Sequence, residues 1–142
     1  MLRIGCLAVA LLLGASVAHA ASIEGYWYGK GYQPIVRKTM QWLTIINTDG
    51  TFSAEFREYD DCLLRYVQTE KGTWTVSAGG YISQTITVNG HPVFKMDDYK
   101  HSFKVLKLDD RKVRYVNEGS GQEWTAQRVT QDFKFPDCKY VS

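Results

Sequence analysis

The stretch "TDGTFSAEF" at residues 48–56 joins a turn to a strand, and this combination recurs through the chain. Asp49-Gly50 is a strong signal for a hairpin turn. After it, Phe52, Ala54 and Phe56 alternate with polar residues, which is the period of a strand with one buried face. Beyond residue 20, no long stretch has the 3.6-residue period of a helix. The pattern therefore predicts an all-β fold.

Similar runs and turn signals divide the rest of the chain into strands. Gly79-Gly80, Asn89-Gly90, Asp109-Asp110 and Gly119-Ser120-Gly121 separate the runs. If two of the runs form one long strand with a bulge at Gly72, the total is eight strands. The expected strands are residues 24–31, 39–48, 51–58, 63–69, 72–77 (the run that would join 63–69), 81–88, 99–108, 112–118 and a further segment at 122–129.

Eight antiparallel strands joined by short hairpins predict an up-and-down meander. Closing the meander into a barrel leaves no exposed edge strand, and we therefore expect an eight-stranded antiparallel barrel. An open sheet or a sandwich of the same strands is the alternative.

The first twenty residues have the pattern of a signal peptide. Arg3 precedes an apolar run at residues 4–17, and the segment ends in Ala18-His19-Ala20, an A-x-A cleavage signal. The apolar run is too short to span a bilayer comfortably, which makes a membrane anchor the weaker alternative. We expect residues 1–20 to be cleaved and residues 21–142 to form one periplasmic or secreted domain, with a C-terminal tail and no transmembrane segment.

Charge excludes some classes of partner. The chain has 17 basic and 15 acidic residues, and loss of Arg3 leaves 16 against 15, a net charge of +1. Binding to nucleic acid or to an anionic membrane surface needs a basic face, so neither is expected.

The cysteines predict one disulfide. Removal of the signal peptide takes Cys6 away and leaves Cys62 and Cys138, which are expected to pair in an oxidising compartment. The bond would close a loop of 138 − 62 = 76 residues. In the chain-entropy model such a loop adds roughly 4 kcal/mol of stability. Buried or intermolecular thiols are the alternative.

The first and last strands together resemble a known family. Gly25-Tyr26-Trp27 opens the first strand as G-x-W, and Arg128 lies in the last. With an eight-stranded meander, this pattern resembles the lipocalins and the wider calycin group of barrels. The resemblance implies that Trp27 packs at the barrel floor and that Arg128 crosses its indole face. Independently of the resemblance, we expect Gly25 to let the chain approach closely before Trp27. The residues after Arg128 are too few for the family's usual C-terminal helix, and no significant helix is expected outside the signal peptide.

The opening "GYWYGKG" at residues 25–31 also resembles the start of nitrobindin-type haem barrels. In those barrels a histidine near the C-terminus holds the haem, and this sequence has none there. No cofactor is therefore expected.

The predicted inward face of the barrel defines a candidate ligand cavity. One hypothesis is a cavity for a small hydrophobic molecule, such as a fatty acid or an aromatic metabolite; a solid core of large side chains is the alternative. Ile82 and Ile86 are expected to face inward, and Gln84, His101 and Tyr115 would orient a ligand or satisfy one another. The candidate cavity residues are Phe52, Phe56, Trp74, Gln84, His101, Phe103, Tyr115 and Trp124.

No catalytic or metal-binding constellation emerges, and we predict a protein that is not an enzyme. Ser120 lies at a hairpin tip and not in the strand-turn-helix of a nucleophile elbow. The carboxylates at residues 58–61 are neighbours on one loop, whereas acid–base catalysis needs a facing pair. The polar groups of the segment at residues 91–101 fit no recurrent zinc spacing; they are His91, Asp97, Asp98 and His101.

Two classes of function remain. The first is carriage of a small hydrophobic ligand. The second is a rigid protein-interaction module, such as a hydrolase inhibitor that projects hairpin loops toward a protein partner. Apolar residues on both faces of the stretch at residues 42–46 slightly favour an interaction surface. A cavity would support carriage, whereas a solid core with a protruding aromatic loop would support docking.

Overall fold

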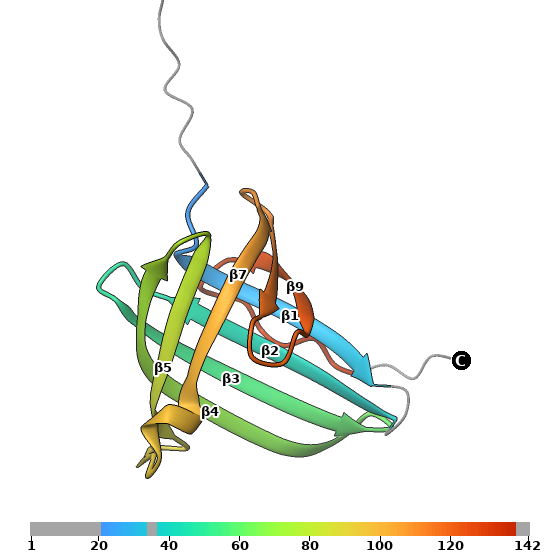
Figure 1. The fold of residues 1–142 in the computed structure, drawn as a ribbon. Helices are drawn as coiled ribbons and strands as arrows, with labels where there is room; N and C mark the ends of the chain where they lie inside the picture. The colour runs from blue at the N-terminus through green and yellow to red at the C-terminus, as the bar shows by residue number, and fades with distance from the viewer. Residues whose placement is uncertain (1–20, 34–36, 139–142) are drawn as a thin grey trace, which may run out of the picture.

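The chain folds into a closed antiparallel barrel of eight strands, which confirms the predicted fold class (Figure 1). The computed structural model describes residues 21–33 and 37–138, and the expected signal peptide lies outside them. Each long strand pairs with the next along the chain, and the last pairs with the first. The strands are β1 (Gly25–Gln33), β2 (Lys38–Ile46), β3 (Thr51–Asp60), β4 (Leu63–Ser77), β5 (Gly80–Val88), β7 (Lys100–Leu108), β8 (Lys112–Asn117) and β9 (Glu123–Val129).

Two short elements interrupt the meander between β5 and β7. The two-residue strand β6 (His91–Pro92) pairs with the end of β5, and η1 (Met96–Tyr99) is a single 3₁₀ turn. In the part of the chain that the structure describes, no helix is long and apolar enough to cross a membrane.

The runs expected at residues 63–69 and 72–77 form one fifteen-residue strand, β4, as the eight-strand interpretation required. The register with β5 shifts between Lys71 and Gly72, which marks a bulge. A side chain at Gly72 would overlap the backbone carbonyl of Gln84, so glycine is needed for this close approach.

Trp27 and Arg128 close one end of the barrel, called the floor here. The Trp27 indole donates a hydrogen bond to the Ile23 carbonyl at 2.7 Å, and the Arg128 guanidinium lies 4.2 Å from the indole ring. The same guanidinium donates to the carbonyls of Ser22, Glu24 and, at 3.0 Å, to that of Asp110. It therefore ties the entering chain and the β7–β8 turn to the last strand.

The opposite end of the barrel is splayed. β9 pairs with β1 only over Tyr26–Gly29, whereas β1 continues to Gln33. On the other side, β7 pairs with β5 only as far as Gln84. The far ends of β1, β2, β3 and β4 therefore extend beyond the barrel as a four-stranded sheet (Figure 1).

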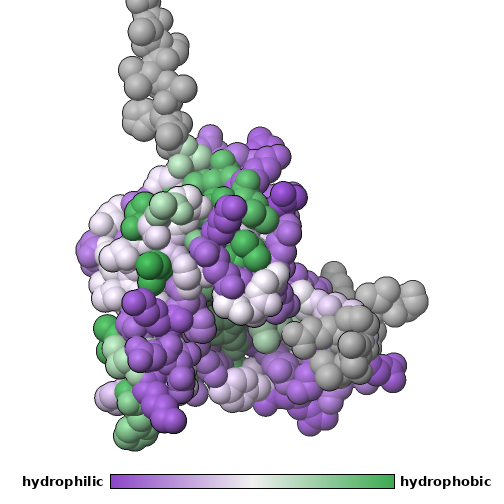
Figure 2. Space-filling model, viewed as in Figure 1, coloured by the Kyte–Doolittle hydropathy of each residue, from purple (hydrophilic) through white to green (hydrophobic). Residues whose placement is uncertain are grey.

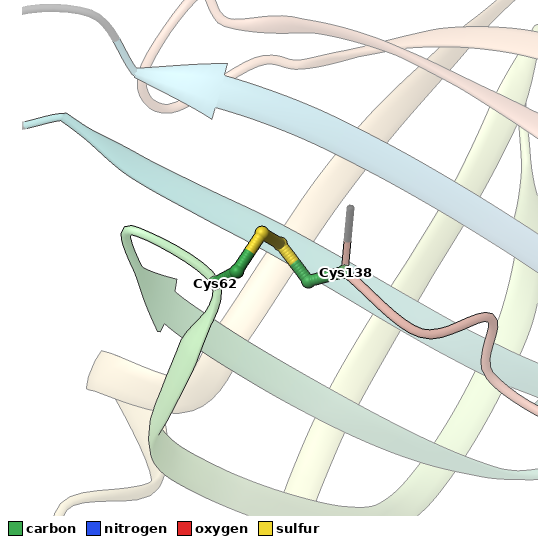
Figure 3. The surroundings of a disulfide bond; sticks show 2 residues. All are labelled: Cys62 and Cys138. Atoms are coloured by element: carbon green, nitrogen blue, oxygen red, sulfur yellow. A yellow bond between two sulfur atoms is a disulfide. The ribbon is translucent and has the colours of Figure 1, made fainter. Parts of the chain in front are cut away.

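The C-terminal tail at residues 130–138 packs on the outer face of this extension. Phe133 lies 4.8 Å from the Tyr28 ring, and the Arg57 guanidinium lies 4.1 Å from the Phe135 ring. The tail ends at a disulfide between Cys138 and Cys62, with Cα atoms 5.1 Å apart (Figure 3). The predicted pairing is thus present, and it fastens the tail to the β3–β4 turn.

Candidate functional site

The barrel encloses a cavity of about 220 Å³. It lies between the floor and the splayed end, and Figure 2 shows apolar side chains at the bottom of a hollow on this face of the molecule. Eight of its sixteen lining residues are Phe, Trp or Tyr, so a ligand would meet mainly aromatic surface. The lining residues are Met40, Trp42, Thr44, Ile46, Phe52, Ala54, Phe56, Glu70, Trp74, Tyr81, Ser83, His101, Phe103, Tyr115, Asn117 and Trp124.

Beyond Trp27, Gly29 and Gly31 leave the inner face of β1 bare, and Trp42 occupies the space beside Gly29. A side chain on Gly29 would overlap three carbons of the Trp42 indole, whereas one on Gly31 would meet Trp124 and Trp42 at ordinary contact distances of 3.6 and 3.9 Å. Trp42 and Trp124 meet edge to face, with ring centroids 5.1 Å apart. This pair forms one wall of the cavity, and Trp42 is only 4% exposed.

A second aromatic group on β5, β7 and β8 continues this lining, because Tyr115 pairs with Trp124 in the β8–β9 register. Tyr81 stacks on Phe103 at 4.8 Å, and Phe103 meets Tyr115 edge to face at 5.6 Å. Burial raises the pKa of Tyr115 to about 12, with a contact from Trp42 acting in the opposite direction. Burial also raises the pKa of Tyr81 well above its ordinary value, with a smaller contribution from Tyr115. Both phenols are therefore neutral at physiological pH.

A row of polar side chains on β4 reaches the cavity at Glu70. Gln68 donates to Glu70 Oε1 at 2.6 Å, and the fully buried Thr85 donates to Glu70 Oε2 at 3.0 Å. Tyr66 donates in turn to Gln68 at 2.7 Å. The carboxylate is thereby held in place by two neutral donors.

Seven of the eight residues predicted to form a cavity line this one: Phe52, Phe56, Trp74, His101, Phe103, Tyr115 and Trp124. Gln84 does not line the cavity, because the face of β5 that points inward is the one opposite to the face expected. Tyr81, Ser83 and Thr85 are buried, whereas Ile86 is 42% exposed. The Gln84 amide instead donates to the Met96 carbonyl at 2.8 Å, outside the cavity. The expectation that Ile82 and Ile86 face inward was therefore wrong.

The reason for this error is chemical. The inner face of β5 carries hydroxyl groups, one of which bonds to Glu70, while its aliphatic residues lie on the outer face. An alternation pattern identifies the apolar face and not the inner one, and here the two differ.

Sequence reasoning also missed Trp42, Tyr81 and Glu70 as cavity residues. Trp42 lay in a stretch with apolar residues on both sides, so its direction was open. Glu70 gave no apolar signal, and only the two-residue spacing of Tyr66, Gln68 and Glu70 indicated a shared face.

The polar groups between residues 91 and 101 do not converge. His101 faces the cavity, whereas His91 lies in β6 and the two aspartates lie in η1. Among the residues that the structure describes, no group of three or more His, Cys, Asp or Glu could hold a metal ion. Ser120 lies in the turn between β8 and β9, where its hydroxyl accepts a bond from the Gln122 amide.

No protein-family model and no curated protein matches the chain.

Proposed function

We propose that this chain is an exported, lipocalin-like carrier that holds one small, mainly apolar molecule inside its barrel. The observation that carries the proposal is the cavity of about 220 Å³ with its aromatic lining. Binding sites for small molecules are typically concave, largely apolar and supplied with a few polar groups that fix orientation. Glu70, Ser83, His101 and Asn117 are such groups here.

Two further features support the lipocalin-like character of the barrel and the export of the protein. The Trp27–Arg128 stack at the floor is the arrangement that the family resemblance implied. The Cys62–Cys138 disulfide is typical of proteins from oxidising compartments, in agreement with the signal-peptide pattern.

The test is binding of N-phenyl-1-naphthylamine, an uncharged probe that becomes fluorescent in apolar surroundings. Thr44→Phe fills the cavity from β2, and Leu43→Phe places the same ring on the outer side of that strand as a control. We expect the parent protein and Leu43→Phe to bind the probe, and Thr44→Phe to bind at least about tenfold more weakly, because the ring occupies the ligand volume. Circular dichroism must show that both variants are folded.

Equal binding by Thr44→Phe, or no binding by the parent protein, would contradict carriage. As an independent measurement, native mass spectrometry of protein purified from its own periplasm would identify any ligand that it carries.

A second candidate function is protein docking, favoured by one loop. Phe94 is completely exposed between β6 and η1, and Met96 beside it is 43% exposed. Figure 2 shows apolar side chains at the lower left, where this loop projects from the barrel. Phe94→Ala separates the two functions, because it should abolish capture of a protein partner and leave probe binding unchanged.

A further inference from the structure

We infer that the cavity selects small aromatic amines, with Glu70 binding the ammonium group, and rejects carboxylates such as fatty acids. The inference rests on the proposed carrier function and assigns the chemical class of its ligand.

The first support is the charge of the lining. Glu70 is the only acidic residue among the sixteen, and they include no lysine or arginine. An anionic ligand would therefore meet a carboxylate without a cation to balance it, and a like charge in a partly desolvated site is costly. A cationic ligand would find the opposite charge.

The second support is that Glu70 lacks an ionic partner. Its two oxygens accept hydrogen bonds from Gln68 and Thr85, both neutral, and no basic side chain of the described residues lies within 4.0 Å of it. A carboxylate has about four acceptor positions, so two further hydrogen bonds can be made. An ammonium group carries donors for them.

The nearby lysine does not change this balance. Lys38 projects from the same face of β2 as Trp42, toward the splayed end, and its Nζ lies 2.6 Å from Glu58 Oε1. The pair is neutral as a whole, and neither residue lines the cavity.

The third support is the surface around the carboxylate. Ala54 lies directly opposite Glu70 in the β3–β4 register, and its small side chain leaves the carboxylate open. Phe52 and Phe56 occupy the diagonal positions on β3 and also line the cavity. Diagonal neighbours in a sheet are within reach of aromatic side chains, and aromatic faces attract cations. An ammonium held by Glu70 would thus lie beside two rings.

The size of the cavity limits the size of the ligand. Its volume of about 220 Å³ lies below the range of roughly 300–1,000 Å³ for drug-sized ligands. It suits a compact aromatic molecule and not a long acyl chain.

The experiment uses three molecules of nearly equal size and different charge. 2-Phenylethylamine is cationic, 2-phenylethanol is neutral and 3-phenylpropionate is anionic at pH 7. Each competes with bound N-phenyl-1-naphthylamine, in the parent protein, in Glu70→Gln and in Glu58→Gln. The second variant is the matched control, because it removes a carboxylate at the splayed end that does not line the cavity.

We expect the amine to displace the probe at a concentration at least about tenfold lower than the carboxylate. Glu70→Gln should weaken amine binding by about tenfold or more, while Glu58→Gln changes it by less than about threefold. Binding of 2-phenylethanol should be nearly the same in all three proteins.

Three results would overturn the inference while the carrier function stands: displacement by the carboxylate as readily as by the amine, no displacement by the amine, or unchanged amine affinity in Glu70→Gln. If the probe does not bind and calorimetry detects no amine binding, both proposals fail.

Discussion

The part of the inner face of β1 that only glycines form leads to a sharp prediction about these two residues. Gly29 and Gly31 both occupy inward-facing positions of β1, and only Gly29 lies tightly against the indole of Trp42. A methyl group on Gly29 would overlap Cζ2, Cε2 and Cη2 of that ring, whereas one on Gly31 would fit at 3.6 Å from Trp124. The two substitutions therefore separate close packing from a general effect of glycine in a strand.

The magnitudes follow from the two environments. Replacing glycine by alanine where the backbone permits it stabilises a protein by about 0.4–1 kcal/mol, because the unfolded chain loses freedom. Overpacking a filled core costs about 1–3 kcal/mol. Trp42 is 4% exposed and packed against Trp124, so its ring cannot move away from Gly29 without disturbing that contact. We expect Gly29→Ala to lose about 2 kcal/mol and Gly31→Ala to lose nothing.

The assay is equilibrium unfolding in urea, followed by tryptophan fluorescence and by circular dichroism. In a domain of this size, 2 kcal/mol corresponds to a fall in Tm of roughly 8 °C. Trp42→Phe removes part of the overlapped ring, so the double variant Gly29→Ala/Trp42→Phe should lose less stability than the sum of the single variants. Equal stability of Gly29→Ala and the parent, an equal loss for Gly31→Ala, or strict additivity in the double variant would each refute the close-packing explanation.

Three further predictions concern the floor, the disulfide and the buried phenols. Arg128→Ala should lower the free energy of unfolding in urea by about 2 kcal/mol. Arg128→Lys should restore less than half of this loss, because an ammonium group lacks the planar set of donors of a guanidinium. An unchanged urea midpoint for Arg128→Ala would contradict a structural role for this residue. Replacing Cys62 and Cys138 together by serine should cost up to roughly 4 kcal/mol yet leave probe affinity unchanged, and a large loss of affinity would instead connect the tail to the cavity. The pKa of Tyr115 is raised to about 12 and that of Tyr81 is raised well above its ordinary value, so both phenols ionise first in the unfolded chain. The free energy of unfolding should therefore be constant below about pH 10 and then fall by about 1.4 kcal/mol per pH unit for each phenol, up to its pKa in the folded protein. Equal urea midpoints at pH 9 and pH 11 would contradict the burial of these phenols.

The sequence was most informative where one face of a strand is apolar and also faces inward. Phe52, Ala54 and Phe56 of β3 are an example, since their alternation and the preceding turn predicted both the strand and its inner side. Closure was also expected from the sequence, because an open meander would leave two exposed edge strands.

The cavity was only partly predictable, because its walls depend on three-dimensional register. The tight turn between β4 and β5 pairs Ser83 with the inward-facing Trp74, so the turn sets which side of β5 faces inward, and the apolar alternation of β5 itself indicates the other side. Trp42 is a cavity residue only because β1 offers glycines opposite it, which is a relation between two strands. Glu70 became notable only when the absence of a cation from the lining could be seen.

The two ends of the described chain leave the barrel at opposite ends. Ala21 and Ser22 lie at the floor near Arg128, whereas Cys138 lies beside the β3–β4 turn at the splayed end (Figures 1 and 3). A tether at the N-terminus would therefore hold the protein with its splayed end directed away from the support, and a tether at the C-terminus would hold it by that end. For immobilised binding measurements, the N-terminal attachment is the one that leaves the approach to the cavity free.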